Sequence, residues 1–207
     1  MTKPDSIARA FAAVDASLRE VFPLDFHSRC MYASLGMVAL LEDAGIAAQM
    51  IGGDIACAVI EKGGNRKGFQ GFGLSSSGAP THFWVETQDL LLDLGLMYLP
   101  HRSTYPLSKL PVVRWNLENH LPDYLDYREI LRYAPGVQLS DATFQRCSVE
   151  FRAHCRTKAQ SLSTSASLKT WELKSHMSLL NASQRGDRWA KEMLLFIKAG
   201  GKAMVPR

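Results

Sequence analysis

The stretch FHSRCMYASLGMVALLEDAG, residues 26–45, decides the fold. It contains no proline, and its only glycine before the last residue is Gly36. Ser28 is expected to be the N-cap of a helix, and Gly45 the left-handed residue that ends it. Apolar residues occupy almost every face until Glu42, which predicts a helix that is buried nearly all round.

Cys30 falls in the first turn of this predicted helix. A thiol there meets the positive end of the helix dipole and unpaired backbone N–H groups, and both favour thiolate over thiol. Cys30 is therefore a candidate nucleophile. The alternative is an inert cysteine that packs as a small hydrophobic residue.

Composition predicts an ordinary globular chain. Its 207 residues are 46% hydrophobic and 21% charged, which suits one domain spanning 1–207. The formal charge of +4 comes without a run of basic residues and interleaved aromatics, so we expect no nucleic-acid partner. We also expect no membrane partner, because no apolar run reaches the ~18 residues that span a bilayer. The oligomeric state cannot be predicted from these features.

The cysteines and the first twenty residues together predict a cytoplasmic protein. The N-terminus carries acidic residues and lacks the apolar core of a signal peptide. The four cysteines form no C-x-x-C pair and no disulfide framework, so neither zinc nor disulfides are implied. Cys147, His154 and Cys155 share one predicted helix but lack two further ligands, and no metal site is expected there.

The segments around the central helix predict one helix, two strands and a loop. A first helix capped by Asp5 or Ser6 should cover the domain with an apolar stripe. After the central helix, residues 46–51 and 55–60 are expected to be two strands around a turn at 52–54. Residues 61–80 are expected to be a loop without a phosphate-binding motif, either a flap beside a site or a solvated surface loop. The stripe of the first helix consists of Ile7, Phe11, Val14 and Leu18.

The stretch THFWVETQDLLLDLG, residues 81–95, predicts two strands joined near Gln88. A two-residue turn at Thr87-Gln88 would place His82 directly opposite Asp93. A turn at Gln88-Asp89 would make this pair diagonal. Both arrangements put the two side chains on one sheet face within reach of a hydrogen bond, whereas a turn with an odd number of residues would separate them.

Cys30, His82 and Asp93 have the residue types of a nucleophile, its base and a group that orients the base. The acid would fix the tautomer of the histidine and favour imidazolium beside thiolate. The alternative makes His82 a satisfied surface histidine and Asp93 a turn residue. Trp84 shares the histidine face by alternation, so it either walls a substrate site or fills the core.

The remaining chain is expected to add two short strands and several helices. A helix capped by Ser140 or Asp141 should present Phe144, Cys147 and Phe151 on one stripe. Gly200 is expected to end the last helix. The other expected elements are strands at 112–115 and 127–133, a linker at 161–167, and helices at 171–180 and 187–198.

The chain resembles the transglutaminase-like superfamily, within the papain-like fold of cysteine enzymes. The matching segments are CMYASLGMVALLEDAGIAAQMIGG, THFWVET and LLLDLG, which cover roughly residues 28–95. The resemblance implies an α+β fold in which a nucleophile helix packs on an antiparallel sheet, with a core at about 26–135 and a helical extension at about 140–200. It also implies Cys30 as nucleophile, His82 as general base and acid, and Asp93 as the orienting carboxylate, without metal or cofactor.

The implied activity is that of a peptidase-like amide hydrolase or acyl transferase acting on a peptide or a small amide or acyl substrate. Papain-like proteases have a Gln upstream of the nucleophile for the oxyanion hole, but no Gln or Asn precedes Cys30 here. The Cys30 N–H could serve, with His27, Ser28 or a later residue as second donor. Many transglutaminase relatives carry Trp before the cysteine, where this chain has Arg29. Two alternatives remain open: an inactive relative that acts as a binding module, and acyl transfer like that of arylamine N-acetyltransferases.

Overall fold

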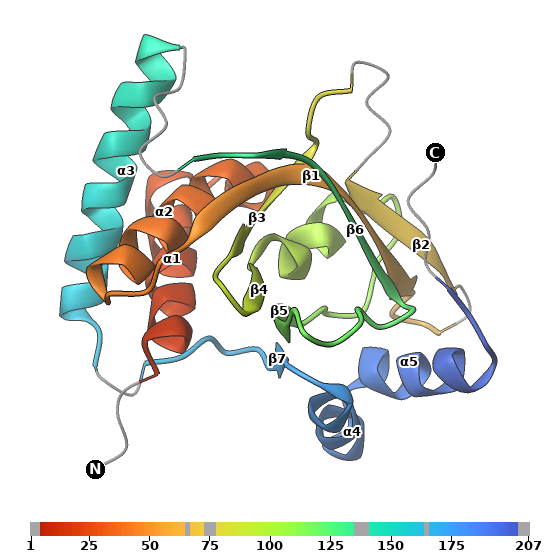
Figure 1. Cartoon of the computed structure of the whole chain (residues 1–207). Helices are drawn as coiled ribbons and strands as arrows, with labels where there is room; N and C mark the ends of the chain where they lie inside the picture. Colours follow the sequence, from red (N-terminus) through yellow and green to blue (C-terminus); the bar gives the residue numbers. More distant parts are fainter. Residues whose placement is uncertain (1–4, 65–66, 73–77, 135–140, 164–165, 203–207) are drawn as a thin grey trace.

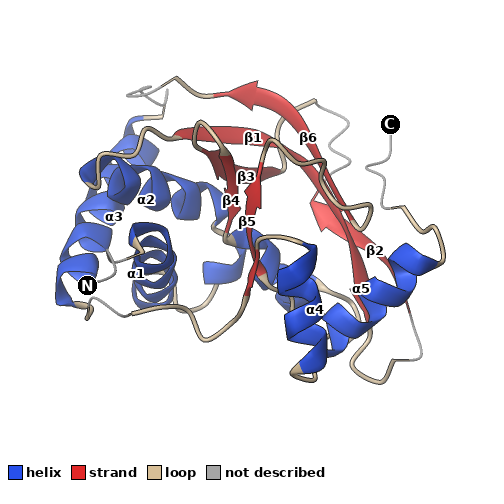
Figure 2. Ribbon diagram, turned by 60° about the horizontal axis from the view of Figure 1, so that its bottom comes forward, coloured by secondary structure: helices blue, strands red, loops and turns tan. Residues whose placement is uncertain are grey.

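The chain folds as an α+β protein around a curled, mixed sheet (Figure 1). The computed structural model describes residues 5–64, 67–72, 78–134, 141–163 and 166–202. Figure 2 shows one group of helices on one side of the sheet and a second group at its other end. The first group is α1 (Ser6–Val21), α2 (Cys30–Asp43) and α3 (Ala142–Ser161), and the second is α4 (His176–Gln184) and α5 (Arg188–Lys198).

The longest strand of the curled sheet pairs with three others. On one edge of β1 the first half pairs with β3 and the second half with β2, while β6 pairs along β1 as well. The strand order is β2-β1-β3-β4-β5-β7, and among the strands that the structure describes every pairing is antiparallel except β5 with β7. The predicted antiparallel sheet is therefore correct for all but that pair. The strands are β1 (Gln49–Ile60), β2 (Lys67–Phe72), β3 (His82–Glu86), β4 (Leu90–Asp93), β5 (Val112–Asn116), β6 (Leu125–Arg132) and β7 (Glu172–Leu173).

The predicted first helix is confirmed as α1. Its N-cap is Asp5, whose carboxylate accepts hydrogen bonds from the N–H groups of Ile7 and Ala8. The four residues of the predicted stripe are all buried, against α2 and α3. This amphipathic helix thus covers the central one, as its spacing indicated.

The prediction of two strands around a turn at 52–54 is wrong, because β1 runs unbroken through these residues. The glycines allow close approach rather than a turn: a Cβ on Gly53 would lie 2.1 Å from the carbonyl oxygen of Arg128 and 2.6 Å from the Trp84 ring. Asp54 is buried and forms an ion pair with the Arg128 guanidinium. The register of β1 against β6 shifts between Gly52 and Gly53, which marks a bulge.

The prediction of a loop throughout 61–80 is also wrong in part. Residues 67–72 form the strand β2, which pairs antiparallel with the second half of β1. The sequence KGFQGF has two glycines and no apolar run, so its strand character comes from pairing with a partner distant in the sequence. Residues 65–66 and 73–77 of this segment lie outside the described residues.

The C-terminal elements agree with the predictions in most respects. Strands occur as β5 and β6, and Asp141 caps α3 through the N–H of Phe144; the alternative cap, Ser140, lies outside the described residues. The linker at 161–167 is described only in part, since α3 reaches Ser161 and 164–165 are not described. Gly200 has a positive φ of 71° after α5, as expected for a helix stop.

The helix predicted at 171–180 begins several residues later than expected. Residues 172–173 pair with β5 instead, and the helix α4 starts at His176. Ser175 forms a capping box with Ser178, which sets this start.

The sheet separates two apolar clusters. Val85 and Leu92 face α1, α2 and α3, whereas Trp84 and Leu91 belong to the cluster that α4 and α5 cover. Whether the chain is one domain stays a prediction. Within the described ranges, none of the helices has the length and apolarity to cross a membrane.

Replacing Gly53 with alanine should destabilise the fold, because the new methyl group would collide with the β6 backbone and with Trp84. Overpacking of this kind typically costs about 1–3 kcal/mol in the free energy of unfolding. Urea denaturation of Gly53→Ala measures this loss. Gly68→Ala is the matched control on the neighbouring strand, because the nearest contact to its added Cβ would be 3.6 Å away. Equal stabilities of the two variants would contradict the close-approach explanation.

Candidate functional site

The helix α2 begins at Cys30, without a side-chain cap. Arg29 occupies the N-cap position and makes no side-chain cap hydrogen bond. The prediction of Ser28 as N-cap is wrong, because its hydroxyl donates to the carbonyl oxygen of Asp25 at 2.8 Å. From Cys30 to Leu41 no residue is exposed, which confirms a helix buried nearly all round.

The β3–β4 hairpin brings His82 and Asp93 to one face of the sheet. Val85 pairs with Leu92 and Glu86 with Leu91, and this register places Trp84 opposite Asp93 and leaves His82 diagonal to it. The turn residues are then Gln88 and Asp89. Of the two even-numbered turns that the sequence allows, the structure has the one that makes the pair diagonal.

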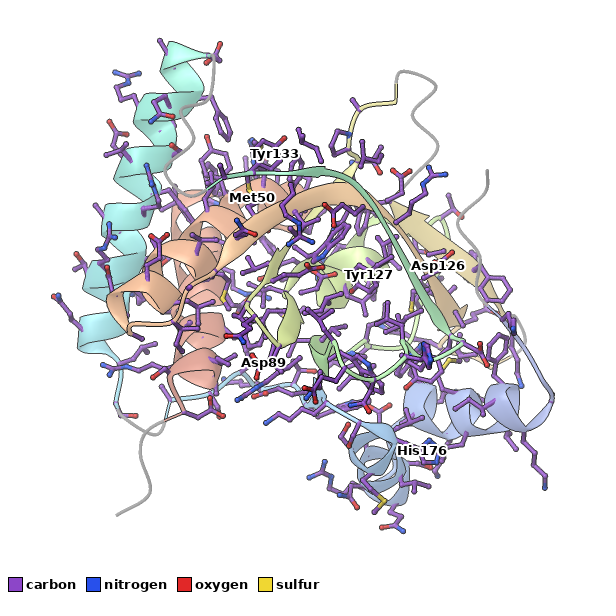
Figure 3. The ribbon with its side chains drawn as sticks, in the orientation of Figure 1. Met50, Asp89, Asp126, Tyr127, Tyr133 and His176 are labelled. Atoms are coloured by element: carbon purple, nitrogen blue, oxygen red, sulfur yellow. The ribbon has the colours of Figure 1, made fainter. Side chains whose placement is uncertain are left out.

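His82 and Asp93 form a hydrogen-bonded pair with no exposure to solvent. Nε2 of His82 lies 2.9 Å from Oδ2 of Asp93, and both side chains are fully buried. The carboxylate also accepts a hydrogen bond from the N–H of Gly95 at 2.7 Å and one from the Tyr127 hydroxyl at 2.7 Å. Figure 3 places Tyr127 on β6, beside the interior of the curled sheet. Asp93 is thereby held by donors from three separate elements.

The charge of Asp93 controls the ionisation of His82. Burial lowers the pKa of His82, but the negative charge and the hydrogen bond of Asp93 outweigh burial, and the Cys30 thiol adds to the upward shift. The result is a pKa of about 10. Because Nε2 bonds to Asp93, Nδ1 is the ring nitrogen left for Cys30; among the described residues this buried atom has no partner with full hydrogen-bond geometry.

Two aromatic rings stack on the imidazole. Phe72, at the end of β2, lies nearly parallel to it, with centroids 4.8 Å apart and an interplanar angle of 8°. Trp84 stacks at 6.3 Å, with only 2% of its surface exposed, and its indole N–H donates to Glu86. Trp84 therefore shares the histidine face, as alternation predicted, and lies in the core. Direct contact of Trp84 with a substrate stays a prediction.

The two residues predicted beside the thiol lie in a short 3₁₀ helix, η1 (Phe26–Ser28). His27 is half-buried and stacks on His101, with ring centroids 5.5 Å apart. Burial lowers the pKa of His101, and the charges of His27 and Arg19 lower it further. The backbone N–H of Ser28 and its hydroxyl both donate to the Asp25 carbonyl oxygen. Substrate-binding roles for His27 and Ser28 stay predictions.

Three residues of this site were not predicted from the sequence: Phe72, Gly95 and Tyr127. Phe72 lies in a glycine-rich stretch without strand character, and Tyr127 is 34 positions from the carboxylate it contacts. Gly95 could have been suspected from the sequence, because it lies only two residues after Asp93. A Cβ on Gly95 would lie 2.5 Å from Cε1 of His82, so the imidazole occupies the space that a side chain would need.

Two of the other three cysteines, Cys57 and Cys155, are more buried than Cys30. Cys57 is fully buried, and burial together with the Asp93 charge raises the pKa of its thiol. Burial likewise raises the pKa of Cys155, to about 11. Cys147 is half-buried on α3, as Cys30 is on α2, which makes it a useful comparison. No cluster of three metal-ligating side chains occurs among the residues that the structure describes.

The raised pKa of His82 predicts that stability falls at alkaline pH. A histidine with a pKa near 6.5 in the unfolded chain and about 10 in the folded one stabilises the fold fully below pH about 6.5. That contribution declines as pH rises and is lost above pH about 10. NMR titration of the imidazole should show it protonated at pH 8. The midpoint urea concentration of unfolding should fall between pH 7 and pH 10. In Asp93→Asn both effects should shrink; an imidazole that titrates near pH 6.5 in the unaltered chain would refute the prediction.

Alanine at Gly95 should displace the imidazole without changing any ionisable residue. The added methyl group would collide with Cε1 of His82 and lie 3.1 Å from Oδ1 of Asp93. We expect the pKa of His82 to fall toward its ordinary value, because the hydrogen bond to Asp93 would lengthen. NMR titration measures this shift, and Gly68→Ala again serves as the control. An unchanged titration curve would show that the ring has room to spare.

Comparisons with known proteins assign no family to the chain. No family model matches it, and no curated protein matches it. One solved structure, described in its title only as the crystal structure of a genomics target, is similar over 82% of this chain and 83% of its own. The sequence identity is 17% and the TM-score is 0.46. At these values the similarity carries no argument about function.

Proposed function

We propose that this chain is a thiol-dependent amide hydrolase or acyl transferase, with the nucleophile-helix arrangement of the papain-like and transglutaminase-like enzymes. One observation carries the proposal: a single buried imidazole bonds to the Asp93 carboxylate through Nε2, and the Cys30 thiol contributes to the raised pKa of the same ring. Nucleophile, base and orienting acid in this order are the parts of thiol acyl transfer.

In the proposed reaction the proton of Cys30 resides on His82, and the thiolate attacks the carbonyl carbon of the substrate. The tetrahedral adduct collapses as the imidazolium gives its proton to the leaving amine, which departs and leaves an acyl group on sulfur. Water or a second amine then attacks the thioester and gives its proton to the imidazole. The C–S bond breaks, the acyl product leaves, and the thiolate–imidazolium pair is restored. Asp93 holds the ring in position and stabilises its positive charge.

The uncapped start of α2 supports a site for the developing oxyanion. Because Arg29 provides no side-chain cap, the first-turn N–H groups of the helix have no side-chain acceptor. The backbone N–H of Cys30 is the nearest of these to the nucleophile. Both donors of Ser28 are bonded to the Asp25 carbonyl oxygen, so the second donor would come from His27 or from a later residue.

The substrate class proposed is a peptide or a small amide or acyl compound, and the reaction needs no cofactor. All four cysteines are free. A reducing compartment such as the cytoplasm would keep the nucleophile as a thiol and suits the proposal.

Iodoacetamide should alkylate Cys30 much faster than Cys57 at pH 7, because Cys57 is fully buried while Cys30 is half-buried beside a cationic ring. Cys147 is the matched control, since it has comparable burial and lies on a different helix. His82→Ala should slow alkylation at Cys30 by about tenfold or more and leave Cys147 unchanged. Mass spectrometry of timed digests measures all three rates.

Equal, slow rates at Cys30 and Cys147 would contradict the proposal and favour a binding module built on the same scaffold. A panel of acyl donors then separates the enzymatic alternatives: peptides and glutaminyl amides for a hydrolase or transamidase, acetyl-CoA with an arylamine for acetyl transfer. Cys30→Ala is the control throughout. Activity that survives this substitution would refute Cys30 as nucleophile.

A further inference from the structure

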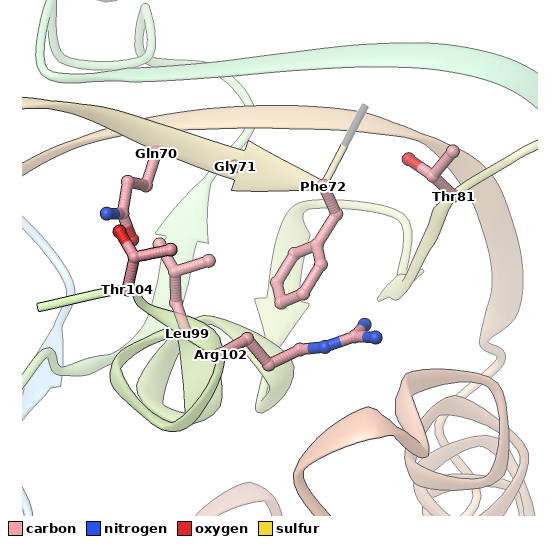
Figure 4. Close-up of a pocket in the computed structure, with 7 residues that line it drawn as sticks. All are labelled: Gln70, Gly71, Phe72, Thr81, Leu99, Arg102 and Thr104. Carbon is pink, nitrogen blue, oxygen red and sulfur yellow. The ribbon is translucent and has the colours of Figure 1, made fainter. Parts of the chain in front are cut away.

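A pocket of about 480 Å³ is lined by Phe72, the residue whose ring stacks on the His82 imidazole. Figure 4 shows Phe72 pointing from β2 into this space and Arg102 extending beneath it from the end of the 3₁₀ helix η2 (Gly95–Arg102). The Phe72 ring contacts the imidazole on which the proposed function depends and also lies 5.8 Å from the Arg102 guanidinium. The described lining residues are Gln70, Gly71, Phe72, Thr81, Leu99, Arg102 and Thr104.

Arg102 is the only charged residue among the described residues that line this pocket. Its guanidinium makes no ion pair or hydrogen bond with any part of the chain that the structure describes, in contrast to Arg128, which is paired with Asp54. The Thr81 hydroxyl donates to Asp54, and the Gln70 amide donates to Ser103. Arg102 is thus the one charged group that the described lining offers to a ligand, beside the Thr104 hydroxyl and the Gln70 carbonyl oxygen.

A guanidinium without a protein partner, beside an apolar ring, suits a carboxylate. Its parallel N–H groups match the two oxygens of that anion, while the Phe72 ring and Leu99 provide apolar surface for a short carbon chain. The chain as a whole carries a formal charge of +4, which also favours an anionic ligand.

We propose that this pocket binds a carboxylate of the acyl substrate through Arg102, so that the preferred substrates are amides of dicarboxylic acids or of acidic residues. The identification of the ligand as a substrate rests on the proposed function. The binding of a carboxylate can be tested without it. Arg102 is in this view a specificity-determining residue, and Phe72 separates the carboxylate from the reacting imidazole.

The first test is equilibrium binding, which does not require catalysis. Glutarate is titrated into ¹⁵N-labelled protein at low ionic strength, with the neutral diamide glutaramide as the comparison ligand. We expect glutarate, and not glutaramide, to shift the amide resonances of Gly71 and Thr104. Arg102→Gln should weaken glutarate binding about tenfold, and Arg102→Lys should weaken it less. Arg146→Gln, an exposed arginine on α3, is the matched control and should bind as the unaltered chain does.

The second test is kinetic and uses two fluorogenic amides of 7-amino-4-methylcoumarin, one butyryl and one succinyl. They differ only in a terminal methyl group against a carboxylate. The ratio of their kcat/KM values should favour the succinyl amide in the unaltered chain and in Arg146→Gln. In Arg102→Gln that preference should fall about tenfold, through KM rather than kcat.

The outcomes separate this inference from the proposed function. Glutarate shifts that are absent, or equally strong in Arg102→Gln, overturn the pocket whatever Cys30 does. A succinyl preference that survives Arg102→Gln overturns the substrate role of the pocket. If Cys30 proves unreactive toward iodoacetamide, the proposed function fails and the substrate role fails with it, while Arg102-dependent glutarate binding would still establish a carboxylate site.

Discussion

The rest of the structure depends on one buried interaction, the hydrogen bond between His82 and Asp93. Neither side chain has any exposure to solvent, and removing an ionised pair from water is costly unless further hydrogen bonds compensate. Here they come from the backbone of Gly95 and from the hydroxyl of Tyr127. The curl of the sheet is what brings β6 close enough to supply the second of these. The elements around the hairpin therefore supply hydrogen-bond donors to the carboxylate as well as apolar side chains to the core.

Buried ion pairs can often be replaced by apolar residues of similar volume with no loss of stability, whereas removing one partner leaves an unpaired charge. The space around His82 is also kept free of side chains at Gly95, and two aromatic rings enclose it. An imidazole held this way keeps Nδ1 without a partner of full hydrogen-bond geometry among the described residues, which is the arrangement that the proposed reaction requires.

Local periodicity predicted the parts of this site that local forces determine. The helix after Arg29 and the shared face of His82 and Asp93 follow from spacing within a few residues, and turn length limited the pair to two registers. The unbroken β1 was not predictable, because Gly53 resembles a turn residue until the β6 carbonyl beside it is known. Phe72 and Tyr127 join the site only because their strands, β2 and β6, pair with β1. The residues next to them in the sequence do not indicate this long-range pairing.

The missing N-cap of α2 connects the stability of the chain to its proposed chemistry. A Ser, Thr, Asp or Asn at position 29 would typically add about 1 kcal/mol to helix stability by accepting a first-turn N–H. Arg29 accepts none, so these donors stay without a side-chain partner at the point where Cys30 begins the helix. Extensive burial of the rest of α2 offsets that cost, since tertiary packing contributes more to a buried helix than its cap. The same helix can therefore be firmly packed along its length and unsatisfied at its tip, where an oxyanion would need donors.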